Sequence, residues 1–406
     1  MYPRKILAIL IAIAFITPIY GNAAEVETPS GKATIGAVAK WMWGWSYKDE
    51  DTLNDGRDEY STVLADITLD AQLTDKISFM IEIASSWNQD MATGSLGTFS
   101  GPDETGTTGV RQASITLDRM VPWTTIEIGT FIPPITNYMD RPVHDLDLIL
   151  YPLIIDASNM DTGMYGNRPA ARDFGLWQQT GVNFHIEAPY LVKIDLGLWD
   201  GTMPDSLGNE EQNLATATSV VFTFDPTKDL SISLAFWGEE FQPEGSLPGI
   251  ADGAKRNLTT WFAYASYETD LLELNVDYAQ ALIPEAIEDT SGELQQLEWE
   301  AWQFTAGYWV VPSVQIIGRY ESINPNMQDD TQIPSSRYDE STWFTLGANW
   351  AVTEHALVSA NYIWKWENGR MIDEGDPGQD PTLPGYDPKY SAQNNDLLLV
   401  QVQVYQ

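Results

Sequence analysis

The chain contains no cysteine, few basic residues and only one long apolar run. Its 406 residues include 21 Lys and Arg against 58 Asp and Glu, which gives a formal net charge of −37. The absence of cysteine excludes a disulfide framework of the kind that stabilises small secreted domains. The acidic balance argues against nucleic acid as a partner, because phosphate backbones are bound by Lys and Arg. It favours soluble loops and the attraction of cations.

The apolar run lies at the N-terminus and is typical of a secretory signal. Two basic residues precede an apolar segment from Ile6 to Ile19, and Gly21-Asn22-Ala23 supplies the small residues that a signal peptidase requires. We expect residues 1–23 to be removed after export through the Sec pathway, with cleavage after Ala24 as the alternative. The remainder, residues 24–406, is expected to form a single domain. A membrane-spanning helix needs about 20 apolar residues, and no other run approaches this length.

The chain instead contains segments in which apolar and polar residues alternate. At its C-terminal end, Leu398, Val400 and Val402 share one face of an extended chain, while Gln401 and Gln403 share the other. A strand at the end of a chain leaves one row of backbone groups unpaired, which invites aggregation. A barrel removes this edge by pairing the last strand with the first.

About sixteen such segments follow one another, and tight turns alternate with long polar loops. This order is typical of an all-β, transmembrane antiparallel β-barrel, whose turns are short on one side and longer on the other. Missing one hairpin would change the number of strands to fourteen or eighteen. We expect long polar loops at 88–110, 241–257, 282–298, 323–340 and 368–395. The alternating segments are 33–47, 63–73, 77–86, 112–118, 124–131, 173–187, 191–199, 214–225, 230–237, 258–268, 271–279, 301–310, 314–321, 341–350, 357–366 and 398–405.

Tryptophan and tyrosine are abundant for so acidic a chain, with 16 and 18 residues. In a membrane barrel, amphipathic rings of this kind are favoured at the two membrane–water interfaces. Several of them lie on the predicted lipid-facing side of a strand near one of its ends. The predicted interface aromatics are Trp41, Trp43, Trp45, Tyr47, Trp350, Trp364 and Trp366.

Residues 133–172 lack clean alternation and contain the apolar run 148–155. A surface loop this apolar is unusual, whereas a loop folded inward against the wall would narrow the lumen. We therefore expect a long inward-folded constriction loop, with an extra strand pair or an outer lid as the alternatives. Its candidate pore-lining residues are Arg141, His144, Asp145, Asp147, Arg172 and Asp173, although the last two also fit a structural pair at a strand start.

Parity along the strands predicts which charged residues face the lumen. Both signs occur on this face, but carboxylates outnumber bases, so the lumen should favour cations or neutral solutes. The strand candidates are Lys40, Asp66, Asp70, Glu82, Lys193, Asp195, Arg319 and Lys365.

Several short stretches resemble the phosphate-selective porin O and P family of sixteen-stranded outer-membrane barrels. The stretches are Ile128-Gly129-Thr130-Phe131-Ile132-Pro133-Pro134, Arg172-Asp173-Phe174-Gly175 and Leu196-Gly197-Leu198-Trp199-Asp200-Gly201, followed by 345–350 and 358–362. The resemblance implies a diffusion channel, usually a homotrimer, with inward-folded loops at its constriction. The family's anion channels carry ladders of Arg and Lys that this chain lacks, and Ile132 stands where members commonly have Lys. Phosphate selectivity is therefore not expected.

No catalytic constellation is evident. The three histidines are scattered, and neither a Gly-x-Ser-x-Gly nor a His-Glu-x-x-His stretch occurs. Asp49, Asp51 and Asp55 lack the ligand spacing of a helix-loop-helix calcium site. We expect no enzyme activity, no metal and no cofactor.

Three functions fit the sequence. The first is a passive diffusion channel for small hydrophilic solutes or ions in the outer membrane of a Gram-negative bacterium, with lipid and the barrel-assembly machinery as partners. The second is a structural sleeve that insulates a periplasm-to-surface multihaem cytochrome. The third is a soluble β-sandwich that binds carbohydrate. The first is preferred, because the alternation and the aromatic content fit a membrane barrel best.

Overall fold

The structure is a computed structural model that describes residues 24–28, 31–47, 59–89, 107–136, 148–149, 179–187, 192–200, 216–241, 256–288, 294–324, 341–367 and 396–405. All regular elements in these ranges are β-strands. No helix in the described part of the chain is long and apolar enough to cross a membrane. The strands are Ala24–Thr28 (β1), Gly31–Tyr47 (β2), Glu59–Thr74 (β3), Ile77–Gln89 (β4), Thr107–Val121 (β5), Thr124–Phe131 (β6), Gln179–Glu187 (β7), Val192–Trp199 (β8), Thr216–Thr227 (β9), Leu230–Phe241 (β10), Arg256–Glu268 (β11), Leu272–Glu288 (β12), Leu294–Val311 (β13), Val314–Asn324 (β14), Ser341–Thr353 (β15), Ala356–Glu367 (β16) and Asp396–Tyr405 (β17).

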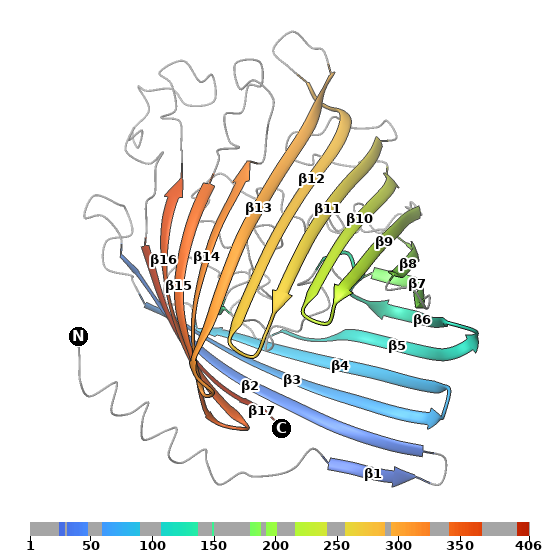
Figure 1. Ribbon diagram of the computed structural model, residues 1–406, viewed down its shortest axis with the longest axis horizontal. Coiled ribbons are helices and arrows are strands. Elements are labelled where there is room, and N and C mark those ends of the chain that lie inside the picture. Colours follow the sequence, from blue (N-terminus) through green and yellow to red (C-terminus); the bar gives the residue numbers. More distant parts are fainter. Residues whose placement is uncertain are drawn as a thin grey trace.

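Sixteen of these strands, β2 to β17, form one closed antiparallel barrel (Figure 1). Each strand pairs with its neighbours in sequence, and β17 pairs with β2 to close the wall, from Asp396 opposite Tyr47 to Tyr405 opposite Val38. Closure removes the exposed edges that an open sheet would leave. The short strand β1 pairs with the beginning of β2, where Ala24 lies opposite Ile35. The predicted barrel of sixteen antiparallel strands is confirmed.

The barrel is polar inside and apolar outside. On β14, the side chains of Gln315, Arg319 and Glu321 are buried on the inner face, whereas Ile316 and Tyr320 are exposed on the outer face. Successive side chains of a strand point to opposite faces, so this alternation places every second residue in the lumen wall. A soluble protein buries its apolar side chains, and this inverted arrangement is that of membrane-spanning barrels.

The exposed apolar belt has the height that such barrels require. On β13 it runs from Trp302 through Phe304 and Tyr308 to Val310. Eight residues rise about 26 Å along a strand, or roughly 20 Å along the barrel axis at a tilt of about 40°. Aromatic rings meet on this outer face, with 5.2 Å between the ring centroids of Trp302 and Tyr320.

Several of the tight turns share one local device. Thr74, Thr227, Thr269 and Thr353 each end a strand or follow it, and each hydroxyl oxygen accepts a hydrogen bond from the backbone N–H two residues later, at 3.1–3.4 Å. A hydroxyl that bonds its own backbone in this way favours a turn over continued strand. The sequence therefore specifies where these hairpins reverse.

One predicted loop is wrong. Residues 282–298 were expected to be a long polar loop, but β12 continues to Glu288 and β13 begins at Leu294. The register shifts between Ile283 and Ile287, around Pro284, because proline has no N–H to donate to the ladder. The wall is consequently tall here, with strands of 17 and 18 residues, and low at β6 to β8, with strands of 8, 9 and 8 residues.

Candidate functional site

The candidate functional site is the inner face of the barrel. Its buried charged side chains comprise six carboxylates and three bases, so the excess of acid predicted for the lumen is present among the described residues. The carboxylates are Asp66, Glu82, Glu239, Glu273, Asp277 and Glu321, and the bases are Lys40, Arg256 and Arg319.

Amide side chains connect these charges across β12 to β15. Gln315 on β14 donates from Nε2 to Glu273 Oε2 on β12 at 3.1 Å, and accepts at Oε1 from Asn349 Nδ2 on β15 at 3.0 Å. Gln303 Nε2 donates to Asp277 Oδ2 at 2.6 Å. Hydrogen bonds of this kind compensate for the cost of burying a carboxylate. These hydrogen bonds link inner-face side chains of β12, β13, β14 and β15.

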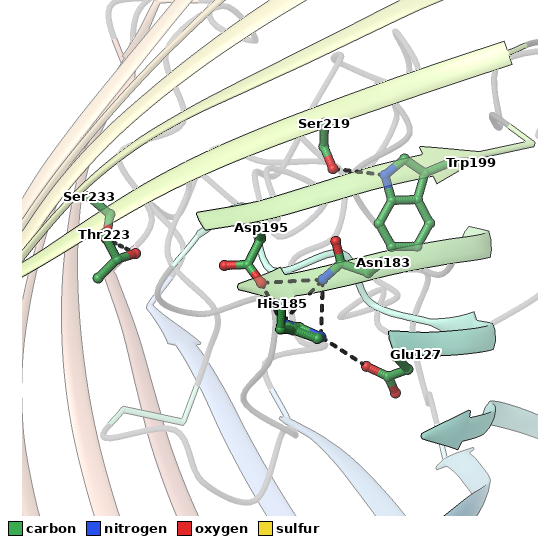
Figure 2. A network of polar contacts seen from close by, with 8 residues as sticks. All are labelled: Glu127, Asn183, His185, Asp195, Trp199, Ser219, Thr223 and Ser233. Atoms are coloured by element: carbon green, nitrogen blue, oxygen red, sulfur yellow. Dashed lines mark hydrogen bonds and ion pairs between the residues drawn. The ribbon is translucent and has the colours of Figure 1, made fainter. Parts of the chain in front are cut away.

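A second polar cluster lies on β6, β7 and β8 and remains partly accessible. Figure 2 shows His185 between two carboxylates, with Nδ1 against Asp195 Oδ1 and Nε2 at 3.5 Å from Glu127 Oε2. Asn183 donates from Nδ2 to Asp195 Oδ1 at 3.4 Å. Register explains the cluster, because Asn183 pairs with Glu127 and His185 pairs with Asp195. The His185 side chain is 33% exposed, compared with 15% for Asp195.

Charges of alternating sign continue around the wall from this cluster. Lys193, on the same face of β8 as Asp195, places Nζ at 3.0 Å from Asp225 Oδ2 on β9. Thr223 and Ser233 extend the polar row to β10 through a hydroxyl–hydroxyl contact of 2.7 Å (Figure 2). Of these residues, Lys193 is the most accessible, with 53% of its side chain exposed.

Tryptophan also lies on the inner face, which the interface prediction did not anticipate. Trp199 packs between Phe131 and Trp237, at centroid distances of 5.1 and 6.2 Å. Its Nε1 donates to Ser219 Oγ at 2.9 Å, and Trp237 Nε1 donates to Glu239 Oε2 at 3.2 Å. These rings are buried, so they fill space inside the barrel rather than meet lipid.

The chain that leaves β6 does not run straight out to solvent. Ile132, Ile135 and Thr136 are buried, and Ile135 donates its backbone N–H to Pro133 O at 2.8 Å. Gly129, just before this segment, has φ 143°, and a Cβ at this position would collide with the backbone carbonyl of Ala113. Glycine is therefore required where β5 and β6 approach each other.

Two residues farther along the same segment contact the opposite wall. Leu148 and Ile149 are buried, and Leu148 lies against Gly347 on the inner face of β15. Asn361 on β16 accepts a hydrogen bond from the Ile149 backbone N–H at 2.7 Å, while its amide nitrogen donates to Ala360 O. Strand β15 is distant from β6 in the order of the wall.

The structure places the predicted site residues as follows. Lys40, Asp66, Glu82 and Arg319 are buried on the inner face, whereas Asp70 and Lys193 are exposed on it and Asp195 is intermediate. The backbone of Lys365 lies in β16, opposite Trp343, but the structure does not describe its side chain. The candidates Arg141, His144, Asp145, Asp147, Arg172 and Asp173 lie outside the described residues.

The predicted interface aromatics are on the outer face wherever their side chains are described. Trp41, Trp350 and Trp366 are exposed, and Trp43 and Trp364 are partly so. The structure does not describe the side chains of Trp45 and Tyr47. For all seven aromatics, the position at a membrane–water interface remains a prediction.

Sequence reasoning missed the roles of Glu127 and His185. His185 was treated as one of three scattered histidines, and Glu127 was not among the inward acids, although strand parity would have placed it with Gly129. No group of metal-ligating side chains that could hold an ion occurs among the described residues.

No protein-family model matches the sequence, and no curated protein sequence is similar to it. The resemblance to the phosphate-selective porin O and P family accordingly remains a prediction.

Among solved structures, the outer membrane channel DcaP of Acinetobacter baumannii is similar with a TM-score of 0.61 at 10% identity, covering 95% of this chain and 100% of that one. An anion-selective porin from Comamonas acidovorans gives 0.56 at 11% identity, covering 93% and 100%. The trimer form of OmpT from Vibrio cholerae gives 0.55 at 12% identity, covering 93% and 100%. At such low identity the similarity concerns the fold alone. The chain has the sixteen-stranded barrel fold of outer-membrane porins.

Proposed function

We propose that this protein is a passive diffusion channel for small hydrophilic solutes or ions in the outer membrane of a Gram-negative bacterium. One observation carries the proposal: a closed sixteen-stranded wall has charged and amide side chains inside and an apolar belt outside. Such a wall is stable only with lipid around it and polar groups within it. It offers polar solutes a path that the bilayer does not.

We further propose that the channel prefers cations to anions. The six buried carboxylates of the inner face outnumber its three bases. The accessible row on β6 to β9 adds Glu127, Asp195 and Asp225 against His185 and Lys193. A lumen lined by excess negative charge concentrates cations. The similar fold of an anion-selective porin does not oppose this, because selectivity depends on side chains and the two chains share few of them.

The constriction is proposed to come from residues 133–172. Two described parts of the chain support this proposal. Ile132, Ile135 and Thr136, which follow β6, are buried, and Leu148 and Ile149 contact β15 and β16 on the inner face. We expect a segment with contacts at both of these places to cross the lumen. This crossing would narrow the pore and expose the segment's own charges to passing ions.

A homotrimer is part of the proposal. The fold similarity to an outer membrane protein that has a trimer form supports it. Cross-linking of the folded protein, followed by electrophoresis without heating, would reveal the number of copies.

Planar-bilayer recording tests the proposed function. The refolded protein should give stepwise conductance in KCl, a reversal potential of the sign expected for K⁺ over Cl⁻ in a KCl gradient, and no block by added phosphate. Anion preference with phosphate block would contradict the charge argument. A folded barrel without conductance would contradict the channel itself and favour the sleeve for a multihaem cytochrome.

A further inference from the structure

We infer that the hairpin tip between β5 and β6, residues 118–124, is a lipid anchor that inserts where headgroups meet acyl chains. The inference rests on the proposed function, because it requires the barrel to lie in a membrane. It adds a specific contact, made by one turn, to a wall that otherwise meets lipid through its strands. The hairpin lies at the right-hand edge of the barrel in Figure 1.

The tip exposes three large apolar side chains close together. Met120, Val121 and Trp123 are 55%, 53% and 61% exposed. The turns at Asp75-Lys76 and Lys228-Asp229 carry charged residues instead, and the turn after β13 exposes only Val310 and Val311 among its large apolar residues. Leaving three large apolar side chains in water is unfavourable in proportion to their area. Contact with lipid would remove this cost.

The backbone of the tip holds a rare conformation. Pairing moves from Leu117 opposite Ile126 to Val121 opposite Thr124, so three residues of β5 face the single residue Thr125. Arg119 has φ 47° and Trp123 has φ 62°. Residues other than glycine seldom adopt positive φ, and where they do the surrounding structure must enforce it.

Hydrogen bonds to both sides fix this shape. Asp118 donates its N–H to Lys76 O at 2.8 Å, and Thr125 Oγ1 donates to Asp118 Oδ1 at 2.9 Å. On the other side, Glu187 donates its N–H to Trp123 O at 2.9 Å. The tip is thus tied to β7 and to the turn before β4, and its apolar side chains are presented by a defined scaffold.

The neighbouring surface indicates lipid as the occupant. Ile115 on β5 and Ile128 on β6 are exposed on the outer face, and the tip continues their apolar surface to the rim. Tryptophan is favoured at the membrane interface, with its ring among acyl chains and its N–H among polar groups. The Arg119 side chain is 70% exposed beside it. Its Nε lies 3.9 Å from Asp118 Oδ1, and its other N–H groups suit a lipid phosphate.

The absence of cysteine from the whole chain allows a direct test by single-site spin labelling. A nitroxide is attached to M120C, and separately to V121C, in protein refolded into vesicles of phosphatidylcholine and phosphatidylglycerol. Its accessibility to oxygen, which partitions into lipid, is compared with its accessibility to nickel ethylenediaminediacetate, which stays in water. K76C in the polar turn before β4 is the matched control, and I128C reports whether the wall lies in lipid.

If the tip is anchored in lipid, the ratio of oxygen to nickel accessibility for labels at positions 120 and 121 should be several-fold above the ratio at position 76. It should remain below the ratio at position 128. A ratio equal to that at 76 would place the tip in water and overturn the inference. Labels shielded from both reagents would show that protein covers the tip, which also overturns it. If the label at 128 is not in lipid, the proposed function fails as well, so the two failures are distinguishable.

Discussion

Leu148 lies directly over Gly347, where a side chain on the inner face of β15 would start 2.6 Å from Leu148 Cδ2. The glycine therefore leaves the space that this contact occupies. Because Leu148 belongs to the segment that follows β6, the pair brings this segment into contact with a distant strand of the wall. The proposed constriction depends on this contact.

Substituting G347L should displace Leu148 from the wall and widen the lumen. We expect larger single-channel conductance, together with a loss of about 1–3 kcal/mol of stability from overpacking if the segment resists. Bilayer recording and the urea midpoint measure the two effects. The adjacent Ala348 is exposed on the opposite face, so A348L is the matched control and should leave conductance unchanged. Unaltered conductance in a folded G347L barrel would argue against a constriction at this contact.

Two charges on one strand make opposite predictions for ion selectivity. Asp195 and Lys193 share the inner face of β8, and both are partly accessible. A unit charge about 10 Å from an ion in water changes the energy of that ion by about 0.4 kcal/mol, with opposite signs for K⁺ and Cl⁻, so their permeability ratio changes by about fourfold. K193Q should therefore raise the preference for K⁺ over Cl⁻, and D195N should lower it.

Reversal potentials in a KCl gradient measure this change. E354Q removes a carboxylate that is 87% exposed in the turn before β16 and should have little effect. Shifts of the same sign for K193Q and D195N would show that the row on β6 to β9 does not control selectivity.

Two of the ion pairs on the inner face should differ greatly in their contribution to stability. Arg319 and Glu321 pair on β14 with 3% and 0% of their side chains exposed, and removing one partner of a buried pair typically costs about 3–5 kcal/mol. Lys193 and Asp225 are more accessible, and a pair of that kind contributes about 0–1 kcal/mol. R319M should lower the urea midpoint of the folded barrel much more than K193M. Equal decreases in the urea midpoint for R319M and K193M would mean that the polar network on β12 to β15 does not depend on the charge of Arg319.

Alternation in the sequence was sufficient to predict the barrel and most of its strands. Strand β6 has the predicted bounds, 124–131, because a turn containing Pro122 precedes it and the Ile132-Pro133-Pro134 stretch follows it. The error at 282–298 has a physical cause. Apolar and polar residues do not alternate strictly from Leu282 to Glu288, and Pro284 predicts a break in the ladder, yet the backbone pairing continues beyond this proline with a shifted register.

The cluster around His185 could not be predicted in the same way. Glu127, His185 and Asp195 meet because β6 and β8 both pair with β7 in one particular register. A shift of two residues would preserve the alternation of every strand and separate the three side chains. The inner tryptophans are different, because parity alone places Trp199 with Asp195. The rule that tryptophan belongs at the interface was applied without that check.

Processing of the N-terminus should leave Ala24 as the first residue. Cleavage there would keep the described strand β1 whole, including Ala24, which pairs opposite Ile35 of β2. The intact mass of protein extracted from the outer membrane should match residues 24–406. Tyrosine at the last position of a signal is poorly accepted by the peptidase, which prefers small residues, so A23Y should accumulate as precursor. A mature chain that begins elsewhere would contradict the assigned cleavage site.

The apolar belt is the feature on which the membrane location depends, and Leu346 tests it. This side chain is exposed on the outer face of β15, opposite Tyr362 of β16 and one residue from the buried Thr345. If the belt faces lipid, L346R places a charge in the hydrocarbon region and should cost about 2–4 kcal/mol near the bilayer midplane. The urea midpoint of refolding into vesicles measures the loss, and L346M, which keeps the position apolar, should be close to the parent. In a soluble barrel the same arginine would meet water and leave stability almost unchanged, so a small effect of L346R would place this face outside the membrane and contradict the proposed function.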